Sequence, residues 1–135
     1  MFAEAHIAAD RRLQEFIGRL KALASIPSIS TDPAHWPDVE RAAAWLSDWM
    51  HDIGMQNVRT FTRGEYLPLV YGDHLGAGPD APTVLIYTHY DVQPAAREDG
   101  WDTEPFEPEI IDGKLYARGA VDSKIHVIAQ LSAIA

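Results

Sequence analysis

Apolar residues recur at three- and four-residue intervals in two stretches near the start of the chain, which places them on one face of a helix. The first stretch predicts a helix over residues 3–25 that ends before Pro27, because the residue preceding a proline disfavours helical backbone angles. The second predicts a helix over residues 38–53, with Asp38 as its N-cap and Gly54 as its C-terminal stop. The turn-rich stretch between these two helices is expected to be a loop.

Beyond the second helix the apolar residues alternate with polar ones, as in half-buried strands. Residues 58–62 and 67–71 are therefore expected to be neighbouring strands, and Pro68 places the second near a sheet edge. The nearly continuous apolar run over residues 83–88 predicts a central strand that is covered on both faces. Residues 109–116 predict a hairpin around an Asp-Gly turn.

The final stretch, residues 123–135, predicts a third helix with one largely apolar side. That side consists of Lys124, Val127, Ile128, Leu131 and Ile134. The stretch ends without a glycine, a basic last turn or a polar tail, which is unusual for a finished domain. Together the elements predict a single domain over residues 1–135, of the α/β class and with an incomplete sheet.

Composition narrows the possible functions. Hydrophobic residues make up 47% of the chain and charged residues 23%, which is typical of a globular protein. The net charge of −9 argues against a nucleic-acid or anionic-membrane partner. No cysteine is present, so a metal ion would have to be held by histidine and carboxylate. No signal peptide and no apolar stretch of about 20 residues is found, so we expect a cytoplasmic protein.

A candidate metal site follows the apolar run. His89 and Asp91 come directly after it, where α/β proteins place their ligands, and in extended backbone these two side chains share a face. A carboxylate beside a metal-bound imidazole fixes its tautomer, and a carboxylate such as Asp122 can bridge two cations. Taken alone, a His-x-Asp pair is more often an ordinary hydrogen-bonded pair, and Asp122 is more simply an N-cap of the last helix.

Other conspicuous side chains are assigned structural roles. Tyr87, Tyr90 and Trp101 are expected to pack, and Arg118 is expected to tie down its loop through hydrogen bonds. The remaining histidines lack a matching partner in the sequence and are interpreted as surface or structural residues: His6, His35, His51, His74 and His126.

Four segments of the chain are informative as motifs: Ile-Pro-Ser-Ile-Ser-Thr (26–31), Thr-His-Tyr-Asp-Val-Gln-Pro (88–94), Gly-Trp-Asp-Thr-Glu-Pro-Phe-Glu-Pro (100–108) and Asp-Gly-Lys-Leu-Tyr-Ala-Arg-Gly-Ala-Val-Asp-Ser-Lys (112–124). In order and spacing they closely resemble the co-catalytic zinc exopeptidases. This family includes the carnosinase-type dipeptidases, aminoacylases, succinyl-diaminopimelate desuccinylases and related carboxypeptidases. The resemblance implies part of a three-layer α/β/α catalytic domain. It also implies hydrolysis of a dipeptide or N-acyl amino acid by metal-activated water.

The same resemblance implies roles for individual residues. His89 matches a ligand of one zinc ion, Asp91 the catalytic acid that orients this ligand, and Asp122 the carboxylate that bridges both metals. Two Zn²⁺ ions are expected in a complete site, although histidine and carboxylates also accept Mn²⁺ or Co²⁺. The bond between Asp122 and Ser123 is expected to be cis. Ile125 departs from the glycine that is usual in the family, and its branched side chain is expected to change how the last helix packs.

The family's general base and its other ligands, including a Glu-Glu pair, match no position up to residue 135. We therefore expect the chain to be a truncated amino-terminal portion of the catalytic domain, with weak metal binding and little activity alone. Family members are often homodimers. An alternative is a complete, non-catalytic interaction module whose contact surface consists of exposed apolar residues. These are Val127, Ile128, Leu131 and Ile134.

Overall fold

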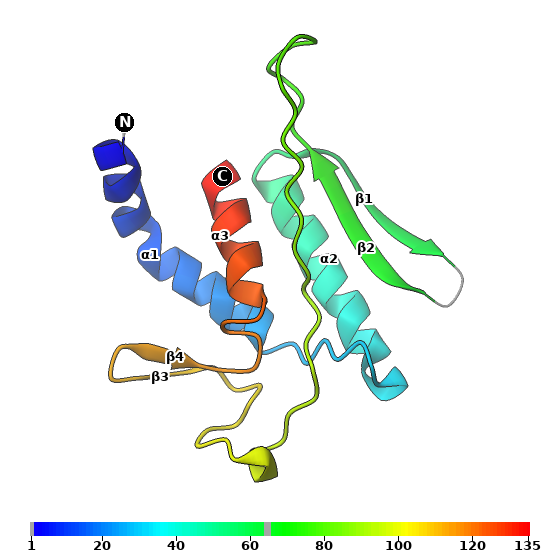
Figure 1. Cartoon of the computed structure of the whole chain (residues 1–135), viewed down its shortest axis with the longest axis vertical. Helices are drawn as coiled ribbons and strands as arrows, with labels where there is room; N and C mark the ends of the chain where they lie inside the picture. The colour runs from blue at the N-terminus through cyan, green and yellow to red at the C-terminus, as the bar shows by residue number, and fades with distance from the viewer. Residues whose placement is uncertain (1, 64–65) are drawn as a thin grey trace.

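The computed structural model describes residues 2–63 and 66–135. Its helices are α1 (Phe2–Ala24), α2 (Trp36–Asp52) and α3 (Lys124–Ile134), with the short 3₁₀ turns η1 (Pro33–His35) and η2 (Arg97–Asp99). Figure 1 shows α3 between α1 and α2. Within the described residues, no helix combines the length and apolar character needed to cross a membrane.

The three helices close one core. Its buried members are Leu20, Leu23, Ile26, Ala42, Leu46, Trp49, Val127, Ile128 and Leu131. The predicted apolar faces of all three helices are therefore confirmed, since each contributes residues to this cluster. The prediction that Val127, Ile128 and Leu131 form an exposed contact surface is wrong, because these side chains are at most 5% exposed where α3 packs against α1.

The start of α2 differs from the prediction. The helix begins at Trp36, with His35 as its N-cap, and Asp38 lies within the first turn instead of capping it. Proline is favoured in the first turn because its missing N–H would have no intrahelical acceptor there, and Pro37 occupies that turn. The carboxylate of Asp38 instead lies 2.9 Å from both Nδ1 of His35 and Nη1 of Arg41. The predicted stop at Gly54, where φ is 81°, is confirmed.

Two hairpins supply the strands. β1 (Gln56–Arg63) and β2 (Tyr66–Asp73) pair antiparallel, with Thr60 opposite Val70, and pack against α2. β3 (Glu109–Ile111) and β4 (Lys114–Tyr116) pair around the predicted Asp-Gly turn. Asp112 and Gly113 both have positive φ, 50° and 75°, as a two-residue turn of this type requires. Both predicted pairings are confirmed.

Residues 83–88 do not form the predicted central strand. The segment has no regular secondary structure, and Val84, Leu85 and Tyr87 are 81%, 88% and 79% exposed. An apolar run specifies a buried strand only when other strands lie on both sides of it, and no described segment pairs with this one. Figure 1 shows the segment as a long connection that crosses in front of α2. The α/β class and the incomplete sheet are confirmed.

Candidate metal centre

The centre of the site is the imidazole of His89, which directly follows residues 83–88, called the extended segment below. Its Nδ1 lies 3.0 Å from Oδ1 of Asp91, two positions further along the chain. Its Nε2 lies 3.1 Å from Oδ1 of Asp122, 33 positions away. The structure therefore brings together all three residues that the sequence singles out.

Asp122 reaches this position through the backbone around Gly119. Gly119 has a φ of 83°, and a Cβ atom there would lie 2.9 Å from Cγ1 of Val92, so only glycine fits without a shift. The peptide bond between Asp122 and Ser123 is cis, as the family resemblance implies. Asp122 is not the N-cap of α3, because Ser123 occupies that position. Its side chain is 86% exposed and is free to contact His89.

The two carboxylates control the charge of His89. Partial burial lowers the pKa of His89, but the hydrogen bonds to Asp91 and Asp122 outweigh that effect and raise the pKa above its ordinary value of 6.5. An imidazolium donates to both carboxylates at once, whereas a neutral ring can donate to only one. In the metal-free chain the site therefore favours a protonated His89.

The donor set fits a divalent metal ion in part. Nε2 of His89 and Oδ1 of Asp122 lie 3.1 Å apart, so both atoms can face the same cation. Asp91 then faces the other ring nitrogen, as a carboxylate behind a metal-bound histidine does. Within residues 2–63 and 66–135, no group of three or more histidine or acidic side chains is placed to hold an ion. Among these residues, only the side chains of His89 and Asp122 are therefore placed to face one ion, fewer than the three protein ligands that catalytic zinc ordinarily takes.

A second segment, residues 28–30, contacts the site, and the sequence did not predict this contact. Residues 28–30 run parallel to residues 90–92, joined by a bridge between Ile29 and Val92 and by the bond from Val92 N–H to the carbonyl of Ser28, 3.0 Å long. The hydroxyl of Ser30 donates to Oδ2 of Asp91 across 2.5 Å. The sequence marked this segment only as a family motif, and no spacing rule links it to a position 61 residues away.

Lys124 anchors the start of α3. It is fully buried, and its Nζ donates to the carbonyls of Leu23, at 3.0 Å, and Ile26, at 2.6 Å. Burial lowers the pKa of Lys124 to about 7, against the opposing attraction of Asp91. The sequence correctly placed Lys124 on the apolar side of the helix. It gave no sign that the ammonium group would tie α3 to the end of α1.

The remaining candidates have the following positions. Arg118 ties down its loop as predicted, since its Nη2 donates to the carbonyl of Pro94 at 3.4 Å and its guanidinium stacks on Trp101. Tyr90 packs on the core and donates its hydroxyl to the carbonyl of Pro68. The prediction that Tyr87 packs is wrong, because it lies in residues 83–88 and is 79% exposed.

Among the other histidines, two have partners within the described residues. Nδ1 of His35 lies 2.9 Å from Asp38, and Nδ1 of His126 lies 3.2 Å from the hydroxyl of Ser123. Both contacts are local to the start of a helix, which agrees with a structural role.

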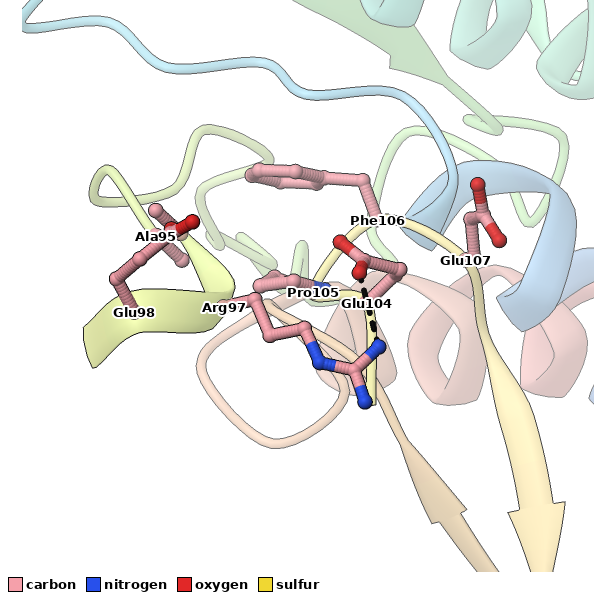
Figure 2. A pocket seen from close by; sticks show the side chains of 8 residues that line it. Ala95, Arg97, Glu98, Glu104, Pro105, Phe106 and Glu107 are labelled. Atoms are coloured by element: carbon pink, nitrogen blue, oxygen red, sulfur yellow. Dashed lines mark hydrogen bonds and ion pairs between the residues drawn. The ribbon is translucent and has the colours of Figure 1, made fainter. Parts of the chain in front are cut away.

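An open concavity of about 320 Å³ lies in the loop that follows the site. Figure 2 shows its lining, which comprises Ala95, Ala96, Arg97, Glu98, Glu104, Pro105, Phe106 and Glu107. Nη1 of Arg97 donates to Oε1 of Glu104 at 3.0 Å, the contact drawn as a dashed line. Both side chains are about half exposed, so this ion pair is in contact with solvent.

Comparison with known proteins identifies the relatives of this site. Residues 85–135, which include all three site residues, match the profile of the peptidase family M20/M25/M40. The Cys-Gly metallodipeptidase dug1 of Schizosaccharomyces pombe is 36% identical over 93% of the chain, and the Beta-Ala-His dipeptidase of Mus musculus is 33% identical over 99%. The chain spans 28% and 31% of these two relatives.

Solved structures agree with the sequence comparison. The crystal structure of human carnosine dipeptidase 1 superposes with a TM-score of 0.82 at 35% identity, over 93% of this chain and 28% of that one. The structure of the dipeptidase Dug1p from Saccharomyces cerevisiae gives 0.78 at 30% identity, over 94% and 30%. The fold described above is therefore similar to that of a part of these longer proteins.

Proposed function

Because the chain belongs to the peptidase family M20/M25/M40, we propose that it forms the amino-terminal part of the catalytic domain of a metal-dependent dipeptidase. The observation that carries the proposal is the placement of His89, whose two ring nitrogens each face a carboxylate. Residues 1–135 act as one structural unit in this proposal. The cytoplasmic location and the homodimer expected from the family resemblance belong to it as well.

We assign the metal-ligand roles to His89 and Asp122. The bound divalent ion, Zn²⁺ by family expectation, would polarise the scissile carbonyl and activate water for attack. Nε2 of His89 and the carboxylate of Asp122 share one side of the site, so both can contact the same ion. The second oxygen of Asp122 is available for another cation, because its side chain is 86% exposed.

Asp91 acts on the imidazole. By accepting from Nδ1–H, its carboxylate would keep the proton on that nitrogen and leave the Nε2 lone pair free for a metal ion. It also makes the ring a stronger donor to a cation, because negative charge behind the imidazole raises its basicity. This is the role of catalytic acid that the family resemblance implies for Asp91.

The substrate class follows from the relatives. Their names specify Cys-Gly and β-Ala-His, two dipeptides with different side chains. We therefore propose a dipeptide as the substrate of the protein that contains this chain, in preference to an N-acyl amino acid. Hydrolysis of an N-acyl amino acid with no hydrolysis of dipeptides would contradict this choice while leaving the metal site intact.

Metal binding tests the proposal directly in the 135-residue chain. Titration with Co²⁺, followed by its visible absorption and by calorimetry, should show binding that His89→Ala and Asp122→Asn each weaken by at least tenfold, since each removes a ligand. His74→Ala is the matched control, because His74 is an exposed histidine in a loop. Equal binding by all four proteins would overturn the assignment.

A further inference from the structure

The carboxylate of Asp91 is held from two sides. Oδ1 accepts from Nδ1 of His89 at 3.0 Å, and Oδ2 accepts from the hydroxyl of Ser30 at 2.5 Å. A carboxylate bonded through only one oxygen can rotate about its terminal bond, whereas bonds at both oxygens fix its plane. The orientation of the imidazole therefore depends on a residue that does not touch it.

Ser30 is itself held in place by its backbone. Its carbonyl accepts from Nε1 of Trp36 at 3.1 Å. Two positions earlier, the hydroxyl of Ser28 donates to the carbonyl of Tyr90 at 2.7 Å, which adds to the parallel bridge between Ile29 and Val92. The backbone of this segment thus has its own connections to Trp36 and to the strand-like residues around Asp91.

These connections separate two roles that Ser30 could have. If its hydroxyl served to attach one segment to the other, its loss would be compensated by the backbone bridge and by the contacts of Ser28 and Trp36. The contact that would be lost is the bond to Oδ2 of Asp91. The effect of removing the hydroxyl should therefore fall on Asp91 and on the imidazole that Asp91 orients.

We propose that Ser30 is a positioning residue that fixes the carboxylate of Asp91, and through it the imidazole of His89, in the geometry for metal binding. This inference deepens the proposed function and rests on it for the role of the metal. The tautomer of the ring, which depends on how well Asp91 accepts from Nδ1–H, can be measured without any metal present.

The first test is the nitrogen NMR spectrum of the His89 side chain in the metal-free 135-residue chain, at an alkaline pH where the ring is neutral. Nδ1–H donates to Asp91 and Nε2–H would donate to Asp122, so the two tautomers compete. Ser30→Ala should shift the population from Nδ1–H towards Nε2–H, because a freely rotating Asp91 is the poorer acceptor. Ser30→Thr keeps the hydroxyl and should restore the spectrum of the unaltered chain.

The matched control is Ser25→Ala. Ser25 is exposed and its hydroxyl donates to the carbonyl of Ala22, a local bond at the end of α1. Its removal is the same chemical change at a distance from Asp91, and the His89 spectrum should stay as it is. An unchanged His89 spectrum in Ser30→Ala would overturn the proposal, since a purely structural hydroxyl would leave the tautomer alone.

The second test is the Co²⁺ titration already described. Loss of a group behind a metal ligand typically weakens binding by roughly 10–100-fold, and Ser30 acts one bond further out, so we expect about a tenfold loss in Ser30→Ala and recovery in Ser30→Thr. If the unaltered chain binds no Co²⁺, the proposed function fails, and the tautomer measurement still decides the role of Ser30. If the chain binds Co²⁺ and Ser30→Ala matches it in both measurements, only the positioning role fails.

Discussion

The helical core and residues 83–88 are both strongly apolar, yet they have opposite environments. Leu23 in α1 is fully buried among residues of α2 and α3, whereas Leu85 in the extended segment is 88% exposed. A helix satisfies its own backbone hydrogen bonds and needs only one covered face, but a strand depends on a neighbouring strand for its backbone hydrogen bonds, and a central strand also on cover of both faces. The same apolar content is thus sufficient for the helices and insufficient for the segment within the described residues.

The largest contrast is expected in amide hydrogen exchange. Backbone amides of Val127, Ile128 and Leu131 lie in a buried helix and should exchange only when the domain unfolds. No backbone bond within the described residues holds the amides of Val84 and Leu85, which should exchange on the order of 10³-fold faster or more. Exchange measured by NMR at low protein concentration checks this.

Protection of Val84 and Leu85 equal to that of α3 would contradict the comparison. Protection that increases with protein concentration would show instead that a second copy of the chain covers the segment.

Truncating one leucine in each region sharpens the comparison. Leu23→Ala should lower the free energy of unfolding by about 2–5 kcal/mol, because it leaves a cavity in the core. Leu85→Ala removes the same atoms from an exposed side chain and should change the free energy by less than about 0.5 kcal/mol. Urea unfolding of both variants provides the measurement. Similar losses in the two variants would mean that the segment is as well packed as the helices.

The sequence predicted what depends on local periodicity and missed what depends on distant partners. The helix faces and the Asp-Gly hairpin follow from spacings of two to four residues, and the structure confirms them. The apolar run over residues 83–88 does not indicate which strands lie beside it. The predicted central strand was wrong because no described strand pairs with this segment. The start of α2 was misplaced because Asp38, a favoured N-cap residue, was predicted to be the cap. Pro37, which is favoured in the first turn of a helix, indicates the observed start at Trp36.

The candidate site shows the same division. His89 and Asp91 share a face because they are two positions apart, and Asp122 was singled out by its place at a helix start and by the family resemblance. Ser30 meets Asp91 across 61 positions and Lys124 meets Ile26 across 98. No periodicity connects such residues, so only the folded chain shows them.

Lys124 tests how the core is joined to the site. Lys124→Met keeps the buried aliphatic chain but leaves the carbonyls of Leu23 and Ile26 without this donor, which should cost about 1–3 kcal/mol of the free energy of unfolding. Lys114→Met is the control, since Lys114 is exposed in β4 and should have little effect. A Lys124→Met variant as stable as the unaltered chain would show that apolar packing fully offsets the lost hydrogen bonds.

The smallest effect is expected at the exposed part of α1, away from the core. Hydrogen bonds from Arg12 and then Arg19 hold the pKa of Glu15 below its ordinary value of 4.5. A carboxyl whose pKa is lower in the folded chain stabilises the fold above the unfolded pKa, and this contribution is lost as the pH falls through the folded pKa.

Glu15→Gln should therefore remove a small acid-dependent part of the stability. Urea midpoints of both chains should differ slightly at neutral pH and converge in acid, and high salt should reduce the difference because exposed ion pairs are screened. A difference that stays constant in acid would mean that Glu15 acts through packing rather than charge. A large difference in the urea midpoints at neutral pH would mean that other residues cover the outer turns of α1.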